Sequence, residues 1–121
     1  MLTMIKALLG LSANSTSVRD AAELVSKGVP LVDVRELGEW QSGHVPKAIH
    51  IPLGDLRRIG VEGLLKRVGK LGPDRPCLFI CQSGMRSAMA CQNVSAGLGK
   101  LAINVTGGMI AWRRAGLDLK P

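Results

Sequence analysis

The sequence predicts an α/β domain in which helices cover both faces of a central parallel sheet of about five strands. Short runs of β-branched residues recur along the chain, and a turn or helix signal follows each of them. Strands that alternate with helices in this way pair in parallel, because each helix carries the chain back across the sheet. The 121 residues, 46% of them apolar and 21% charged, suit one ordinary globular domain.

A helix is expected to open the domain directly after Ser17. The Ser17 hydroxyl can accept hydrogen bonds from the first-turn amides, and the early acid Asp20 complements the helix dipole. Gly28 suits the left-handed position at the end of the helix, and Pro30 prevents its continuation. The runs that we expect to be strands are residues 31–34, 48–51, 77–80 and 103–105. Further helices are expected at residues 36–41, 61–71, 86–96 and 109–115.

Residues 1–15 are expected to form a leader that precedes a single domain at residues 16–121. The leader begins with an apolar stretch, and small residues that resemble a signal-peptide cleavage site follow it. Its uninterrupted apolar run, residues 7–11, is shorter than the ~7–15 residues of a secretory signal, and a membrane-spanning helix needs ~20. We therefore expect a short amphipathic or flexible leader, no membrane span and a cytoplasmic protein. A cleaved signal and a periplasmic location are the alternative.

Composition and charge restrict the partners. The 16 Lys and Arg residues exceed the 9 Asp and Glu residues and give a net charge of +7. Such a surplus favours a small anionic ligand, or a basic face that recognises an acidic protein. The basic residues Arg57, Arg58, Lys66, Arg67 and Lys70 are the candidates for that face, and a solvated helix surface is the alternative. With only three aromatic residues the chain has few rings on which bases could stack, so nucleic acid is not expected as a partner.

The three cysteines point to free thiols. Their number is odd, and the chain is large enough to fold without disulfides. Cys77 lies inside an apolar strand and is expected in the core, and Cys91 is expected to pack on a helix, with a secondary role as sulfur acceptor as the alternative. The scattered histidines and the lack of a paired Cys-x-x-Cys motif argue against a metal site, and no cofactor motif is present.

Cys81 stands where a strand meets the start of a helix. Ligands of parallel sheets bind beyond the carboxyl ends of the strands, which makes this a functional position. The loop after the strand can curl so that its backbone amides converge on the sulfur, and the helix N-terminus adds partial positive charge. Such surroundings stabilise the thiolate, and Arg86 together with the amides would attract an anion. The candidate residues of this loop are Cys81, Gln82, Ser83, Gly84, Met85, Arg86 and Ser87.

The loop resembles the active-site loop of single-domain rhodaneses, and the resemblance extends to both sides of it. It covers roughly residues 17–117, with the motifs in the family's order. The first motif is Asp33-Val34-Arg35-Glu36 followed by Glu39-Trp40 and Gly43-His44-Val45-Pro46, and the closing one is Gly107-Gly108-Met109 with Ala111-Trp112. Two positions depart from the usual pattern: Lys47 stands where glycine is common, and Gln82 follows the cysteine where many members have arginine.

The resemblance implies a rhodanese-like fold and sulfur transfer without a cofactor. Cys81 would attack the outer sulfur of thiosulfate or a related anionic donor and form a persulfide, from which a thiol or cyanide takes the sulfur. The amides of Gln82 to Ser87 would hold the negative charge, and Arg86 would bind or orient the donor. A carrier that delivers the persulfide to an acidic protein partner is the second hypothesis.

Loop length favours sulfur over phosphate chemistry. Four residues separate Cys81 from Arg86. Phosphatases of the dual-specificity cell-cycle class and related arsenate reductases use a loop that is one residue longer, and they stay as the less favoured alternative.

Supporting roles are expected for three residues outside the loop. Asp33 and Arg35 are expected to form an ion pair that braces this face, with substrate contact as the alternative, and His44 to cap or bridge a turn, with proton transfer as the alternative.

Overall fold

The computed structural model describes residues 14–69 and 75–121, and in them a five-stranded parallel sheet forms the centre of the protein. The strand order is β1-β5-β4-β2-β3, and every neighbouring pair is parallel. The strands are β1 (Ser15–Thr16), β2 (Leu31–Asp33), β3 (Ile49–His50), β4 (Cys77–Ile80) and β5 (Ala102–Val105). The predicted α/β class is confirmed, and four of these strands coincide with predicted runs.

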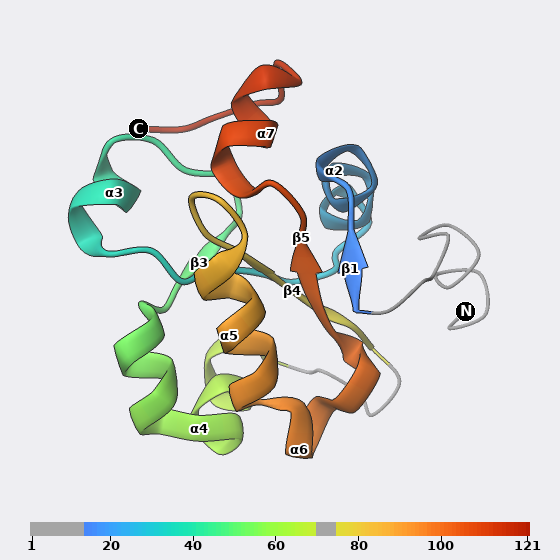
Figure 1. Ribbon diagram of the computed structural model, residues 1–121, viewed down its shortest axis with the longest axis vertical. Helices are drawn as coiled ribbons and strands as arrows, with labels where there is room; N and C mark the ends of the chain where they lie inside the picture. Colours follow the sequence, from blue (N-terminus) through green and yellow to red (C-terminus); the bar gives the residue numbers. More distant parts are fainter. Residues whose placement is uncertain (1–13, 70–74) are drawn as a thin grey trace.

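Helices cover both faces of the sheet (Figure 1). Alternate residues of the central strand β4 divide between two apolar clusters: Leu78 and Ile80 pack on the side of α2 and α7, and Cys77 and Phe79 on the side of α4 and α5. This alternation is the period of two that a pleated strand imposes. The helices are α2 (Val18–Ser26), α3 (Leu37–Gln41), α4 (Leu53–Val68), α5 (Met85–Asn93), α6 (Ser95–Leu98), the 3₁₀ turn η1 (Gly99–Leu101) and α7 (Gly108–Arg114).

The first helix begins as its sequence predicts. Ser17 is the N-cap of α2, and its hydroxyl accepts a hydrogen bond of 3.1 Å from the Asp20 amide. Apolar residues spaced three and four apart then face the sheet, among them Ala21 and Leu24. The predicted leader lies outside the described residues up to position 13, whereas Ser15 already belongs to β1 and pairs with Asn104 of β5.

Two predicted helices have different bounds in the structure. The helix predicted at residues 61–71 begins much earlier, at Leu53, and contains a kink at Gly60, whose φ of 64° is not helical. The end of that prediction, residues 70 and 71, lies outside the described residues. The helix predicted at residues 86–96 is interrupted at Val94, where α5 gives way to α6. Among the described residues, no helix combines the length and the apolar character needed to cross a membrane.

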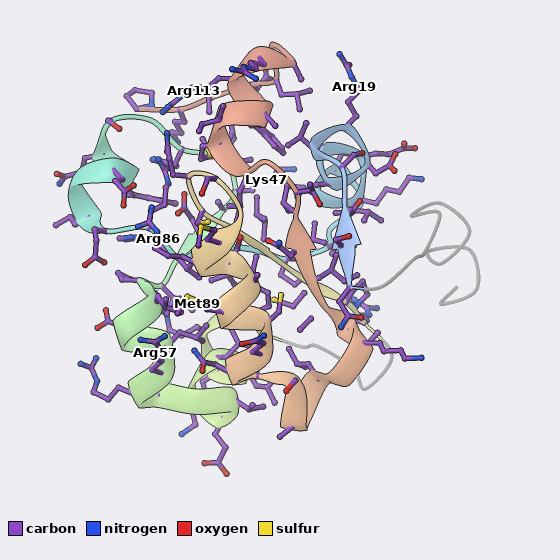
Figure 2. The ribbon with its side chains drawn as sticks, viewed as in Figure 1. Arg19, Lys47, Arg57, Arg86, Met89 and Arg113 are labelled. Carbon is purple, nitrogen blue, oxygen red and sulfur yellow. The ribbon has the colours of Figure 1, made fainter. Side chains whose placement is uncertain are left out.

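Lys47 has an unusual backbone conformation. Its φ is 71°, and it is the only residue other than glycine with a positive φ in the described part of the chain. For a residue with a Cβ this left-handed conformation costs about 1–2 kcal/mol. The side chain is exposed on the connection between α3 and β3 (Figure 2), and within the described part of the chain Lys47 makes no hydrogen bond or ion pair that would offset the strain.

We expect Lys47→Gly to raise the free energy of unfolding by about 0.5–1 kcal/mol, because relief of the strain exceeds the added flexibility of the unfolded chain. Urea unfolding monitored by circular dichroism measures this. Lys47→Ala is the matched control, since it removes the same charge but keeps the Cβ, and it should leave stability nearly unchanged. A glycine variant no more stable than the alanine variant would contradict the strain argument.

Candidate active site

Cys81 directly follows β4 and lies at the floor of a loop that opens at the carboxyl edge of the sheet. Cys81 is buried, with 1% of its surface exposed. The loop turns at Gly84, whose φ of 109° makes it the left-handed N-cap of α5, and the Gly84 amide donates a hydrogen bond of 3.0 Å to Cys81 Sγ. The buried Ser87 hydroxyl lies 3.3 Å from the same sulfur. The predicted convergence of donors on the sulfur is therefore present in the structure.

These donors decide the charge state of the cysteine. Burial by itself raises the pKa of the Cys81 thiol, but hydrogen bonds from the Ser87 hydroxyl and from the amides of Ser87, Gly84 and Ser83 outweigh it. The resulting pKa of Cys81 lies below its ordinary value, as the chemistry of a nucleophile requires. The other two thiols behave in the opposite way. Burial raises the pKa of Cys77 and raises that of Cys91 to about 12, so both stay neutral at physiological pH.

The first turn of α7 fixes the back of the loop. The Met109 amide donates to the Cys81 carbonyl oxygen at 2.8 Å, and the Ile110 amide donates to the Gln82 carbonyl oxygen at 3.2 Å. Gly108 permits this approach. Its φ is 56°, and a Cβ built there would collide with the Cys81 carbonyl oxygen and lie 2.7 Å from that of Gln82. Gly108 thus lets the first turn of α7 contact the backbone of Cys81 directly.

Arg86 points from the start of α5 toward α3 and forms a two-pronged ion pair with Glu39. The two guanidinium nitrogens lie 2.6 and 2.8 Å from the Glu39 carboxylate oxygens. The hydrogen bond from Arg86 holds the pKa of Glu39 at about 2, so the carboxylate stays charged over the physiological range. A guanidinium has five N–H donors, and this pair leaves others for an anion. Glu39 therefore fixes the plane of Arg86 beside the loop.

Asp33 and Arg35 form the predicted ion pair, and it is buried. Arg35 Nε lies 3.0 Å from Asp33 Oδ1, Arg35 NH2 lies 2.8 Å from Asp33 Oδ2, and Arg35 is 1% exposed. The same NH2 group donates to the Gly43 carbonyl oxygen at 2.8 Å, and the Arg35 carbonyl oxygen lies 2.7 Å from His50 Nε2. The pair ties the end of β2 to the segment that contains α3.

His44 belongs to this supporting segment. Its ring stacks on Trp40 with centroids 3.6 Å apart, and its Nδ1 lies 3.0 Å from the Trp40 carbonyl oxygen. Its backbone exchanges two hydrogen bonds of 2.8 Å with Lys120 near the end of the chain. The contact with Trp40 bridges a turn, as the sequence predicts, and the contact with Lys120 joins this segment to the end of the chain. Proton transfer at His44 stays an untested alternative.

Two residues of the site were missed by the sequence analysis. Glu39 is part of the first motif, but its pairing with Arg86 was not predicted because the two residues are 47 positions apart. Asn104 of β5 hydrogen-bonds both Ser87 and Gly84 from a strand that no spacing rule connects to the loop. The one available signal for Asn104 is a polar residue inside an otherwise apolar strand.

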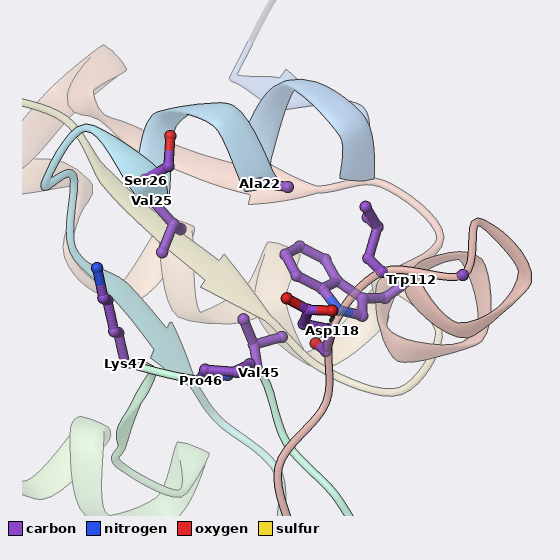
Figure 3. A pocket seen from close by; sticks show the side chains of 10 residues that line it. Ala22, Val25, Ser26, Val45, Pro46, Lys47, Trp112 and Asp118 are labelled. Atoms are coloured by element: carbon purple, nitrogen blue, oxygen red, sulfur yellow. Dashed lines mark hydrogen bonds between the residues drawn. The ribbon is translucent and has the colours of Figure 1, made fainter.

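A separate pocket lies between α2 and the segment after α7 (Figure 3). Its volume is about 300 Å³, and its walls are largely apolar, with Val25, Val45 and Trp112 prominent. Lys47 and Asp118 contribute the charged groups. It contains none of the residues of the Cys81 loop. Within residues 14–69 and 75–121, no group of three or more histidine, cysteine or acidic side chains is placed to hold a metal ion.

The sheet and loop together define a class of protein: α/β proteins that hold a cysteine of lowered pKa between a central strand and a helix N-terminus. Comparison with known families then identifies the family. The rhodanese-like domain matches residues 17–115, and the chain belongs to the rhodanese-like family.

Individual relatives agree with this assignment. The chain is 39% identical over 82 residues to "Putative sulfurtransferase YtwF" of Bacillus subtilis, which covers 68% of this chain and 71% of YtwF. It is 37% identical over 82 residues to "Putative sulfur carrier protein YrkF" of the same bacterium, covering 68% of this chain but only 40% of YrkF. The structure of the human single-domain sulfurtransferase TSTD1 matches with a TM-score of 0.70 at 26% identity, over 85% of this chain and 97% of TSTD1. At the level of the family, the activity is sulfur transfer.

Replacing Gly108 by alanine is expected to destabilise the protein by about 2–4 kcal/mol, because the positive φ and the collision with the Cys81 carbonyl oxygen add together. Gly116→Ala is the matched control, since Gly116 has a φ of 70° but open space around it. That variant should lose only about 1 kcal/mol. Urea unfolding measures both values, and equal losses would show that α7 does not press on the Cys81 loop.

Proposed function

We propose that the protein is a sulfurtransferase that forms a persulfide on Cys81. The sulfur comes from thiosulfate or a related anionic donor, and a thiol or cyanide removes it. One observation carries this proposal: the Gly84 amide and the Ser87 hydroxyl both point at Cys81 Sγ itself, and the pKa of this one thiol is lowered. Such a site favours a thiolate, which is the nucleophilic form of cysteine.

The first step transfers sulfur to the enzyme. The Cys81 thiolate attacks the outer sulfur of thiosulfate, a new S–S bond forms on Cys81, and the S–S bond of thiosulfate breaks. Sulfite leaves with the electron pair of the broken bond, and the single negative charge of the thiolate passes to the outer persulfide sulfur. The loop amides of residues 82–87 stabilise that charge without moving, since they are already held in place. Arg86, oriented by Glu39, attracts the anionic donor.

The second step regenerates the thiolate. Cyanide attacks the outer persulfide sulfur, the S–S bond breaks, and thiocyanate leaves while Cys81 recovers its negative charge. A thiol acceptor removes the sulfur in the same way. In this mechanism Asp33, Arg35 and His44 support the site and do not touch the substrate. The free cysteines suit a reducing compartment, and the cytoplasm stays our predicted location.

Intact-mass measurement after incubation with thiosulfate tests the proposal. Wild type should gain one sulfur atom, and cyanide should remove it. Cys81→Ser should gain none, and Cys91→Ser, which removes a thiol held neutral by burial, should gain one as wild type does. An adduct that persists in Cys81→Ser would overturn the assignment. Inertness toward thiosulfate, persulfide and thiol-bound donors, together with hydrolysis of an aryl phosphate, would instead favour the phosphatase alternative.

A second candidate function is delivery of the persulfide to a protein, and the surface around the loop favours it. Met85 is 76% exposed at the start of α5, Met89 follows one turn later at 41%, and Leu37 at the start of α3 is 57% exposed. Exposed methionines form adaptable contact surfaces for other proteins. Arg86, Met89 and Arg57 follow one another down this face in Figure 2. The proposed partner is an acidic protein that presents a cysteine.

The neighbouring helix α4 supplies the complementary charge. It contains four basic and two acidic residues. Arg58 pairs with Asp55 at 3.3 Å and Arg67 donates to the His50 carbonyl oxygen, whereas Arg57 is exposed and has no ion pair within the described part of the chain. Lys70, the last member of the predicted basic cluster, lies outside the described residues.

Charge reversal at Arg57 tests this delivery function. With an acidic peptide that carries one cysteine as acceptor, Arg57→Glu should reduce persulfide transfer about three- to tenfold, as expected when a steering charge is inverted. Transfer to cyanide should not change. Arg19→Glu, on the distant helix α2, is the matched control and should affect neither acceptor (Figure 2). If both variants transfer to the peptide at the same rate, the basic face takes no part in delivery.

A further inference from the structure

The hydroxyl of Ser87 lies between two acceptors. Ser87 Oγ is 3.3 Å from Cys81 Sγ and 2.5 Å from Asn104 Oδ1. Ser87 is 0% exposed, so bulk water cannot hydrogen-bond its hydroxyl. A serine hydroxyl has one proton and can donate one full hydrogen bond at a time. The two acceptors therefore compete for the same proton.

The other half of the Asn104 amide determines which of its atoms faces Ser87. Asn104 Nδ2 donates to the Gly84 carbonyl oxygen at 3.2 Å. Turning the amide over would set two carbonyl oxygens against each other, so the Oδ1 atom must face the hydroxyl. The backbone of Asn104 is fixed as well, because its amide donates to the Asn14 carbonyl oxygen at 2.8 Å in the sheet. Asn104 thus presents a permanent acceptor to Ser87.

The proton of Ser87 has a different best position in each state of the cysteine. When Cys81 is a thiol, its S–H can donate to Ser87 Oγ while Ser87 donates to Asn104. When Cys81 is a thiolate, the sulfur needs the Ser87 proton, which must then leave Asn104. We propose that Asn104 is a positioning residue that competes with the Cys81 sulfur for the Ser87 hydroxyl proton and so limits how readily the thiolate forms.

A cavity beside Asn104 makes the change of partner inexpensive. It measures about 360 Å³ and is lined by Ser15, Ala88, Cys91 and Asn104, among others. Asn104 is itself partly exposed, unlike Ser87. The lining is mostly apolar but includes polar residues such as Ser15 and Gln92. Water that enters the cavity can therefore hydrogen-bond the Asn104 amide oxygen after the hydroxyl turns to the sulfur. The competition therefore adjusts the thiolate population without blocking it.

The charged groups around Cys81 stay constant in this competition. The hydrogen bond to Glu39 is the main cause of the raised pKa of Arg86, and the negative charge of the Cys81 thiolate adds to it, so Arg86 is an ionised side chain that interacts with the cysteine. Cys77 and Cys91, which share the apolar cluster with Cys81, are kept neutral by burial. The β5 side chain that hydrogen-bonds the loop is the uncharged Asn104. A change at Asn104 consequently reaches the sulfur through uncharged partners, the Ser87 hydroxyl and the Gly84 carbonyl oxygen, and a variant that lacks the Ser87 hydroxyl separates the two routes.

The experiment is a double-mutant cycle read by the pH dependence of Cys81 alkylation. Iodoacetamide is the probe, and peptide mass mapping assigns the modified cysteine. We expect Asn104→Ala to lower the pKa of Cys81 by about half a unit to one unit, which raises its alkylation rate below that pKa about three- to tenfold. Ser87→Ala should raise the pKa, and adding Asn104→Ala to it should change nothing further.

Asn93→Ala, an exposed asparagine on α5, is the matched control and should leave the pH profile unchanged. Asn104→Val is used where the alanine variant melts early, since a β-branched residue suits a strand. A raised or unchanged pKa in the Asn104 variants, or a shift that persists without the Ser87 hydroxyl, would overturn the proposal. It rests on the proposed role of Cys81, yet alkylation needs no sulfur donor. A failure of sulfur transfer and a failure of this competition are therefore seen in separate measurements.

Discussion

The buried ion pair between Asp33 and Arg35 is the interaction on which the active-site face depends. A charge removed from water must be fully paired, and loss of one partner of a buried pair costs about 3–5 kcal/mol. Arg35 uses a further donor on the Gly43 carbonyl oxygen, and its own carbonyl oxygen contacts His50. The chain between these points contains Glu39, which in turn holds Arg86 beside the loop. The buried guanidinium of Arg35 thus helps to position the half-buried guanidinium of Arg86 on a different element.

The cysteine depends on a second balance, between burial and hydrogen bonding. Burial alone makes Cys77 and Cys91 unreactive thiols, and Cys81 is just as inaccessible by its exposed area. It differs because a loop closes around its sulfur, and the close approach of Gly108 holds the backbone of that loop. The same apolar cluster therefore contains two inert cysteines and one activated cysteine. All three are buried, and the pKa of Cys81 differs from the other two because hydrogen-bond donors lie about 3 Å from its sulfur.

The parts of the structure that short-range patterns specify could be predicted from the sequence. The four longer strand signals, the cap at Ser17 and the position of Cys81 at a helix entrance are of this kind, and so is the ion pair two residues apart. The start of α4 was missed because Pro52, Gly54 and Gly60 obscure a helical pattern that packing against α5 stabilises. The strand β1 was missed because it consists of only two polar residues, Ser15 and Thr16. Glu39 and Asn104 meet the loop only after the sheet is assembled, since each contact joins residues far apart in sequence.

The hydrogen-bond donors of the loop also bear on whether the site suits sulfur or phosphate chemistry. In the structure the Gly84 amide and the Ser87 hydroxyl are directed at Sγ, so the centre of the loop is occupied by the cysteine sulfur. Arg86 shares its charge with Glu39, which leaves the loop with less net positive potential than an unpaired arginine would provide. A doubly charged tetrahedral phosphate needs both space and positive charge there, whereas a persulfide adds one sulfur atom with one delocalised charge. Sulfur transfer leaves only that one sulfur atom in the loop, because the sulfite group of the donor departs, and the space within the loop therefore favours sulfur over phosphate chemistry.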